Sequence, residues 1–132
     1  MNNLKLYILA ENTASGKFQA EHGLSYYIEC DTKILFDTGH SDLFLKNAEK
    51  FNVDLKEVST IVLSHGHWDH GDGLRYVSNK KLICHPDVFQ QRFRKGGTEN
   101  IGLALSFKEL KNKFDIVYTR SPYKISNNIT FL

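Results

Sequence analysis

The sequence predicts an α+β fold in a single domain. Its 132 residues are enough for one ordinary domain and too few for two. β-rich segments come first along the chain, and later strands alternate with helical segments. Hydrophobic residues make up 41% and charged residues 24%, as in typical soluble globular chains. We therefore expect one α+β domain over residues 1–132.

Charge, apolar runs and cysteines exclude several classes of protein. The formal net charge of +2 creates no strong field, so we expect no nucleic-acid partner. No apolar run approaches 18 residues, and Lys5 breaks the short apolar patch at the N-terminus, which argues against a membrane helix and a signal peptide. Cys30 and Cys84 lie in apolar runs without C-x-x-C spacing, which indicates buried thiols. We expect a cytoplasmic protein with no membrane partner.

Three β-rich runs open the chain: residues 4–10, 24–30 and 33–37. The last two are joined by Asp31-Thr32, which predicts a hairpin. Between the first two runs, residues 11–23 are polar and punctuated by glycine, so they are expected to form a loop. This loop is long for a compact domain, and long loops are often functional.

A helix and a buried strand follow. Ser41 is expected to cap a helix whose apolar residues recur at helical spacing and which ends at Asn52. Residues 60–63 (TIVL) form a short apolar run of the kind buried on both faces of a sheet. A short helix is predicted near residues 74–77.

The remaining segments alternate between strand and helix. Residues 81–84 resemble another buried strand, and Pro86 opens a predicted helix over residues 86–93. Residues 94–104 are glycine-rich and show no clear pattern. Ser106 and the glutamate three residues later match a capping box, which predicts a helix to about residue 114. The last strands are expected over residues 115–119, 123–126 and 129–132, the final two turned at Asn127-Asn128.

A cluster of metal-ligand residues directly follows the 60–63 strand. The segment SHGHWDHGDG holds three of the six histidines and one aspartate in the pattern H-x-H-x-D-H. Imidazole nitrogens and carboxylate oxygens are standard ligands of zinc, iron and manganese. His65 and His67 would share one side of an extended segment, so both can bind one ion. A tight turn would redirect Asp69 and His70 to a second ion.

The glycines of this segment, Gly66, Gly71 and Gly73, are expected to give the backbone the freedom that this turn needs. The strand before the motif provides a rigid base for the ligands. The absence of H-E-x-x-H argues against a helical zinc-protease site.

SHGHWDHGDGL closely resembles the metal-binding motif of the metallo-β-lactamase superfamily. FDTG (residues 36–39), the strand before the motif and the opening hairpin match the N-terminal half of that superfamily. Residues 20–29 (AEHGLSYYIE) and 84–89 (CHPDVF) resemble the branch that includes relatives of the synthase joining a dihydropterin to a ribofuranosyl-aminobenzene phosphate in methanopterin biosynthesis. The resemblance implies the N-terminal half of an αββα sandwich, with one mixed β-sheet and flanking helices.

The resemblance also implies roles for the motif residues. His65 and His67 would bind the first metal, and Asp69 and His70 the second. Asp69 would also act in catalysis by orienting the nucleophile. Asp37 matches the aspartate of the family's D-T-G, which accepts a hydrogen bond from a ligand histidine and so fixes its tautomer.

The implied cofactor is a divalent metal, zinc first with iron or manganese as alternatives, and up to two ions per complete site. Outside the motif, His22 in the long loop and His85 at the end of a predicted strand are expected to contact a small-molecule substrate. The alternatives are a surface position for His22 and a local turn contact for His85.

The sequence departs from the family pattern in two ways. Asp72 replaces the first glycine of the pair that follows the motif, and aspartate tolerates a left-handed backbone better than most residues. The family's third histidine on the first metal, bridging carboxylate and last histidine have no counterpart, because no histidine follows His85. We therefore expect a truncated domain completed by a partner, either a homodimer mate or a polypeptide carrying the second half.

Three functions remain open from the sequence. The first is a metal-dependent, hydrolase-like protein in which a dinuclear site activates water. The second is a non-catalytic metal-binding or interaction fragment that needs a partner chain. The third is a structural domain without metal, and the metal content of the chain separates it from the other two.

Overall fold

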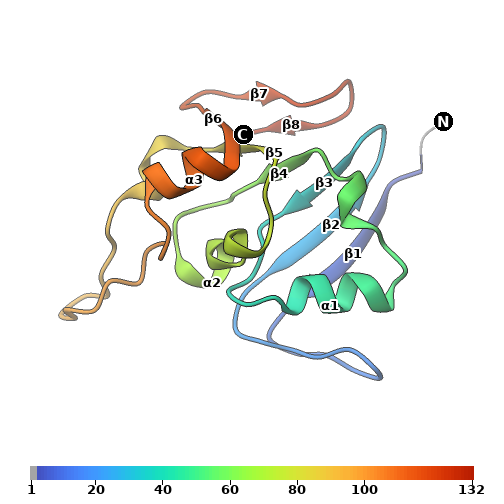
Figure 1. Ribbon diagram of the computed structural model, residues 1–132, viewed down its shortest axis with the longest axis horizontal. Coiled ribbons are helices and arrows are strands. Elements are labelled where there is room, and N and C mark those ends of the chain that lie inside the picture. Colours follow the sequence, from blue (N-terminus) through green and yellow to red (C-terminus); the bar gives the residue numbers. More distant parts are fainter. Residues whose placement is uncertain (1–2) are drawn as a thin grey trace.

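A six-stranded mixed β-sheet forms the centre of the computed structural model, which describes residues 3–132 (Figure 1). The strands lie in chain order across the sheet: β1 (Lys5–Ala10), β2 (Ser25–Glu29), β3 (Lys33–Phe36), β4 (Thr60–Val62), β5 (Lys80–Cys84) and β6 (Phe114–Tyr118). The first two pairings are antiparallel and the next three are parallel. This is the α+β architecture with one mixed sheet that the sequence predicts.

The opening strands form the predicted hairpin. β2 and β3 pair from Tyr26 with Phe36 to Glu29 with Lys33, and Cys30 N donates to Thr32 O in the turn. Residues 11–24 connect β1 to β2 as the predicted long loop. From β3 onward the pairing is parallel, so each connection crosses over the sheet and carries helical turns.

All helical segments pack on one face of the sheet. They are α1 (Leu43–Lys50), α2 (Trp68–Gly71) and α3 (Phe107–Lys113), with 3₁₀ turns η1 (Leu55–Glu57), η2 (Asp72–Tyr76) and η3 (Pro86–Phe89). Phe44 of α1 and Leu110 of α3 are fully buried in one cluster with alternate strand residues such as Leu35 and Leu82. This cluster is the hydrophobic core.

The helix ends largely follow the sequence signals. Ser106 Oγ accepts a hydrogen bond from Glu109 N at 3.2 Å, so the predicted cap opens α3. Asn52 follows α1 with a positive φ of 59°, which suits the predicted stop. The start of α1 differs by one residue, because Asp42 occupies the N-cap while Ser41 Oγ accepts from Leu43 N at 3.1 Å.

Within the described residues 3–132, the other face of the sheet carries no helix. The apolar residues on this face lie opposite one another on neighbouring strands. They are Leu6, Ile8, Tyr26, Ile28, Ile34, Phe36, Val62, Ile83 and Val117. Leu6 and Ile8 on β1 are 52% and 50% exposed, whereas Ile34, Val62 and Ile83 are buried. We refer to this surface as the open face.

A C-terminal hairpin follows β6, pairing β7 (Tyr123–Lys124) with β8 (Thr130–Phe131) around the predicted turn (Figure 1). Its strands are shorter than expected. Ser126 Oγ and Asn128 N both donate to the Asp31 carboxylate, which fixes the hairpin turn at the β2–β3 turn. The segment therefore runs from the end of β6 to the β2–β3 turn, and we attribute the burial in the middle of the open face to it.

The predicted helix over residues 86–93 is wrong beyond its first turn. Pro86 does open a helical turn, but η3 ends at Phe89 and Gln90 is extended, with φ −73° and ψ 146°. The chain then reverses, with Phe93 bridging Asn100 and Ile101 N donating to Arg92 O at 2.7 Å. We call residues 92–101 the 92–101 hairpin. Among residues 3–132, no helix has both the length and the apolar character needed to cross a membrane.

Candidate metal centre

The candidate site lies at the carboxyl edge of the parallel strands. Asp37 directly follows β3, His65 comes three residues after β4, and His85 directly follows β5. Asp37 N donates to Val62 O at 2.9 Å, which fixes the Asp37 backbone beside the end of β4. Loops at the carboxyl ends of neighbouring parallel strands converge, and this edge is where ligands bind in open sheets of this kind.

The four motif residues lie together at this edge. The His65 ring centroid is 4.7 Å from that of His67 and 4.2 Å from that of His70. Asp69 Oδ2 lies 3.8 Å from His70 Nε2. The backbone is extended at His67, with φ −97° and ψ 146°, and then turns into α2. The turn expected to redirect Asp69 and His70 is this single helical turn.

Asp37 is fully buried beneath the motif and accepts three hydrogen bonds. Its Oδ1 accepts from Ser64 N at 2.7 Å, and its Oδ2 accepts from Ser64 Oγ at 2.5 Å and from His70 Nδ1 at 2.7 Å. The structure thus contains the hydrogen bond between Asp37 and a ligand histidine that the resemblance implies. Asp37 has a positive φ of 56°, which suits aspartate better than most residues.

These hydrogen bonds set the tautomers of two histidines. His70 Nδ1 must carry a proton to donate to the carboxylate, so its Nε2 keeps a free lone pair. Ser64 gives its only hydroxyl proton to Asp37, so His65 Nδ1, 2.8 Å away, must donate to Ser64 Oγ. His65 Nε2 is then also a free acceptor. The role of Ser64 in this network was not predicted, because its only signal in the sequence is its place between the strand and the first histidine.

The residues fit the divalent metal that the motif implies. Asp37, His65 and His70 offer ligand atoms within 4.8 Å of one another. Asp37 already accepts from three donors, so its carboxylate is suited to orienting the neighbouring side chains. Burial lowers the pKa of His65, which favours the neutral, ligating imidazole. The hydrogen bond to Asp37 raises the pKa of His70 in the metal-free protein.

The two histidines predicted to contact substrate lie in different surroundings. His22 Nε2 is 3.0 Å from Asp69 Oδ2, and its side chain is 60% exposed, so the long loop reaches the motif at this residue. His85 Nδ1 accepts from Asp87 N at 3.1 Å as the cap of η3, which is the local turn contact noted as its alternative. A substrate contact stays a prediction for both residues.

The motif glycines act through close packing, and the expectation of unusual backbone angles is wrong for them. None of the three has a positive φ. A Cβ on Gly66 would lie 2.2 Å from Val88 O, and one on Gly73 would lie 2.4 Å from Thr38 O. Asp72 has φ −69°, so it needs no left-handed tolerance either. Its Oδ1 instead accepts from Ala104 N at 2.8 Å.

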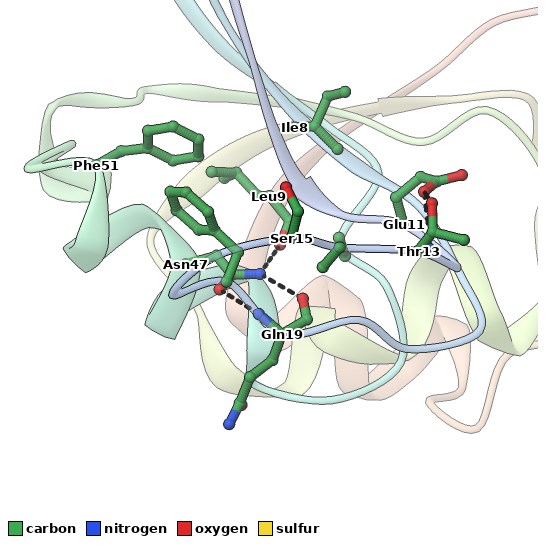
Figure 2. A pocket seen from close by; sticks show the side chains of 11 residues that line it. Ile8, Leu9, Glu11, Thr13, Ser15, Gln19, Asn47 and Phe51 are labelled. Atoms are coloured by element: carbon green, nitrogen blue, oxygen red, sulfur yellow. Dashed lines mark hydrogen bonds between the residues drawn. The ribbon is translucent and has the colours of Figure 1, made fainter.

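The long loop between β1 and β2 is fixed from both sides. Near its middle, the buried Asn47 Nδ2 donates to Leu9 O at 2.8 Å and to Gln19 O at 3.0 Å (Figure 2). A cavity of about 380 Å³ lies here, but Asn47 and Glu11 direct their polar atoms to the loop itself. Near its end, Glu21 accepts from His40 N at 3.0 Å and from Ser41. The cavity therefore belongs to the packing of the loop.

Comparison with known proteins decides the family. The model of the metallo-beta-lactamase superfamily matches residues 19–84, which include the hairpin, Asp37 and the whole H-x-H-x-D-H motif. This chain belongs to the metallo-beta-lactamase superfamily. Its fold corresponds to the N-terminal half of that superfamily, as the sequence indicates.

Two curated relatives come from Methanocaldococcus jannaschii. The uncharacterized protein MJ0448 is 43% identical over 130 residues, which cover 92% of this chain and 50% of MJ0448. The 7,8-dihydropterin-6-methyl-4-(beta-D-ribofuranosyl)-aminobenzene-5'-phosphate synthase is 32% identical over an alignment of 148 residues, which covers 98% of this chain and 50% of the synthase. The chain therefore spans about half the length of these relatives.

Solved structures agree with this assignment. Tm1679, a metal-dependent hydrolase of the beta-lactamase superfamily, superposes with a TM-score of 0.84 at 29% identity, over 97% of this chain and 47% of Tm1679. A quorum-quenching N-acyl homoserine lactone lactonase superposes with a TM-score of 0.57 at 15% identity, over 81% of this chain and 48% of the lactonase, and shares the fold alone.

Proposed function

We propose that this chain binds divalent metal through its H-x-H-x-D-H motif and forms one side of a hydrolase-like dinuclear site. The observation that carries the proposal is the Asp37 network, which leaves Nε2 of both His65 and His70 free to act as ligands. His65 and His67 would hold a first ion, and Asp69 and His70 a second. Zinc suits imidazole and carboxylate donors best, and iron or manganese are alternatives.

A bound metal of this kind supplies the Lewis acidity that makes water a nucleophile near neutral pH. The residues of the chain organise the reaction around it. Asp69, whose side chain is 14% exposed, presents a carboxylate that orients the attacking water and accepts its proton. His22, 3.0 Å from this carboxylate, holds Asp69 on its open side. Asp37 keeps both histidine rings in their ligating orientation.

The similarity to the synthase supports a small-molecule substrate. By its name, the synthase makes 7,8-dihydropterin-6-methyl-4-(beta-D-ribofuranosyl)-aminobenzene-5'-phosphate. We extend to this chain only the class of substrate, a small molecule with an ester, amide or phosphoester bond. No histidine lies among residues 86–132, so further histidine ligands would come from outside this stretch, and we propose a second polypeptide or a second copy of the chain as their source.

The first experiment measures the metal content of the purified protein by inductively coupled plasma mass spectrometry. At least one equivalent of zinc, iron or manganese per chain is expected in the wild type. H65Q should lose most of it. H40Q is the matched control, because His40 lies outside the motif and its backbone N bonds to Glu21, so its metal content should equal that of the wild type. Metal-free wild type, or equal loss in both variants, would contradict the proposal.

The second experiment separates a hydrolase from a non-catalytic metal-binding fragment, which is the alternative function. The metal-loaded chain is assayed with bis(p-nitrophenyl) phosphate and with a simple lactone. Turnover that a chelator abolishes and added zinc restores supports the hydrolase. Metal binding without turnover, both in the chain alone and after mixing with a polypeptide that carries the second half, supports the alternative, in which the chain provides a metal-bearing surface to a partner.

A further inference from the structure

The 92–101 hairpin is attached to the metal motif at several points. Trp68 N donates to Ile101 O at 3.1 Å, and His67 and Gly102 form a β-bridge. The bond from Ala104 N to the Asp72 carboxylate joins the returning chain to η2. The hairpin keeps its own shape through its bridge and a turn in which Gly97 N donates to Arg94 O at 2.8 Å. The 92–101 hairpin is therefore a structured segment attached to the motif.

A cavity of about 670 Å³ lies between this hairpin and the motif. Trp68 and Asp72 form one side, and the other is formed by Arg94 and the segment 97–104. The volume falls in the range of small-molecule sites. Trp68 stands between the proposed ligands His67 and Asp69 in the sequence, so this cavity adjoins the candidate metal centre.

The side chains around the cavity have a distinct chemistry. Trp68 is half-buried and lines the cavity, and Leu103 adds an apolar contact. The Trp68 ring centroid also lies 5.7 Å from that of His22 and 5.0 Å from that of His40. Arg94 is exposed, and within residues 3–132 its guanidinium makes no ion pair and no hydrogen bond. Glu99 lines the same cavity with the opposite charge. An indole face binds flat rings, and a free guanidinium binds carboxylates and phosphates.

We propose that this cavity binds the substrate of the metal centre, and that this substrate is a planar aromatic ring carrying one anionic group. The ring stacks on Trp68 and the anion pairs with Arg94. Glu99 disfavours a second negative charge on the ligand. The proposal rests on the proposed function only in assigning this ligand to the metal centre, since the recognition itself needs no metal.

The chain contains one tryptophan, so its fluorescence reports on the surroundings of Trp68, which include this cavity and the rings of His22 and His40. The metal-free protein, prepared with a chelator, is titrated with phenyl phosphate, with benzyl alcohol and with inorganic phosphate. Saturable quenching is expected with phenyl phosphate at millimolar concentration or below. The two other probes lack either the anion or the ring, so each should bind about tenfold more weakly or worse.

Two variants test the charges. R94Q should weaken phenyl phosphate binding roughly 3- to 10-fold, the range for one charge-assisted bond at an exposed site. E99Q, a matched change on the same hairpin, should leave the affinity equal or improve it. Both positions are exposed, so the fold should tolerate either substitution, and circular dichroism checks this.

An absence of saturable quenching overturns the proposal, and so does equal affinity in R94Q and the wild type. Equal affinity for inorganic phosphate and phenyl phosphate overturns the role of the ring. If phenyl phosphate binds as expected but the purified protein holds no metal, the cavity stands and the proposed function fails. If metal binds but phenyl phosphate does not, the proposed function stands and this inference fails.

Discussion

Asp37→Asn tests the buried carboxylate beneath the motif with the smallest change in shape. Asparagine has the same size as aspartate and tolerates the positive φ of 56° at this position, so backbone strain does not confuse the result. The change replaces one carboxylate oxygen by an NH₂ group. All three groups bonded to Asp37 are donors, so the NH₂ group of asparagine would face another donor whichever way the amide is turned.

The structure shows what each orientation costs. With NH₂ facing Ser64 N, two N–H groups oppose each other in a fully buried site, which costs about 1–3 kcal/mol of stability. With NH₂ facing the other side, Ser64 Oγ can turn to accept, but His70 can accept only by moving its proton to Nε2. That shift removes the lone pair proposed to bind metal. Zinc affinity should therefore fall about 10- to 100-fold, the usual effect of losing such a partner.

The assay is competition for zinc against a chromophoric chelator, combined with urea unfolding of the metal-free protein. Asp31→Asn is the matched control, because the exposed Asp31 carboxylate also accepts two hydrogen bonds, from Ser126 and Asn128, far from the motif. D31N should bind zinc like the wild type. An unchanged zinc affinity in D37N would refute the role given to Asp37.

Three further predictions follow from packing and burial. Gly66→Ala should lower the free energy of unfolding in urea by about 1–3 kcal/mol, because its Cβ would collide with the Val88 backbone. Gly97→Ala, whose Cβ would lie 3.3 Å from Arg94 O, should change stability much less, and equal effects of the two changes would contradict the packing argument. Burial raises the pKa of the Cys84 thiol to about 12, so Cys84 should react with an alkylating reagent only after unfolding, whereas the half-buried Cys30 should react in the native protein. Mass spectrometry measures both reactions, and equal labelling rates would show that Cys84 is accessible. Light scattering should give a molar mass above the 15.2 kDa of one chain, because the open face is expected to pair with a second copy, and Ile8→Lys should reduce this mass. A wild type that stays monomeric across the micromolar range would rule the pairing out.

Much of the fold was predictable because local signals agreed with it. The β-rich runs, the Asp31-Thr32 turn and the Ser106 cap each encode their structure within a few residues. The helix expected over residues 86–93 failed because tertiary contacts override local pattern there. The chain has to reverse after Phe89 to bring Ile101 back to Trp68. The Gly96-Gly97 pair marks the turn of this hairpin, but it does not specify that the returning chain pairs with the motif.

The clustering of the motif histidines was predictable from the sequence, and the residues that support them were less so. The spacing of the histidines marks the motif, and the structure gathers their rings at one edge of the sheet. Ser64 escaped notice because a serine after a strand is common, and its importance appears only when Asp37, 27 residues earlier, lies within hydrogen-bond distance. The motif glycines were read as flexible because the sequence does not show which backbone lies against them.

The most direct test of the metal centre is a crystal structure of the purified protein with anomalous diffraction data collected at the zinc, iron and manganese edges. We expect a metal peak coordinated by His67 and Nε2 of His65, or by Asp69 and Nε2 of His70, with Asp37 hydrogen-bonded to His70 and outside the coordination sphere. A peak coordinated directly by Asp37, or no peak at the motif in metal-loaded crystals, would contradict this expectation.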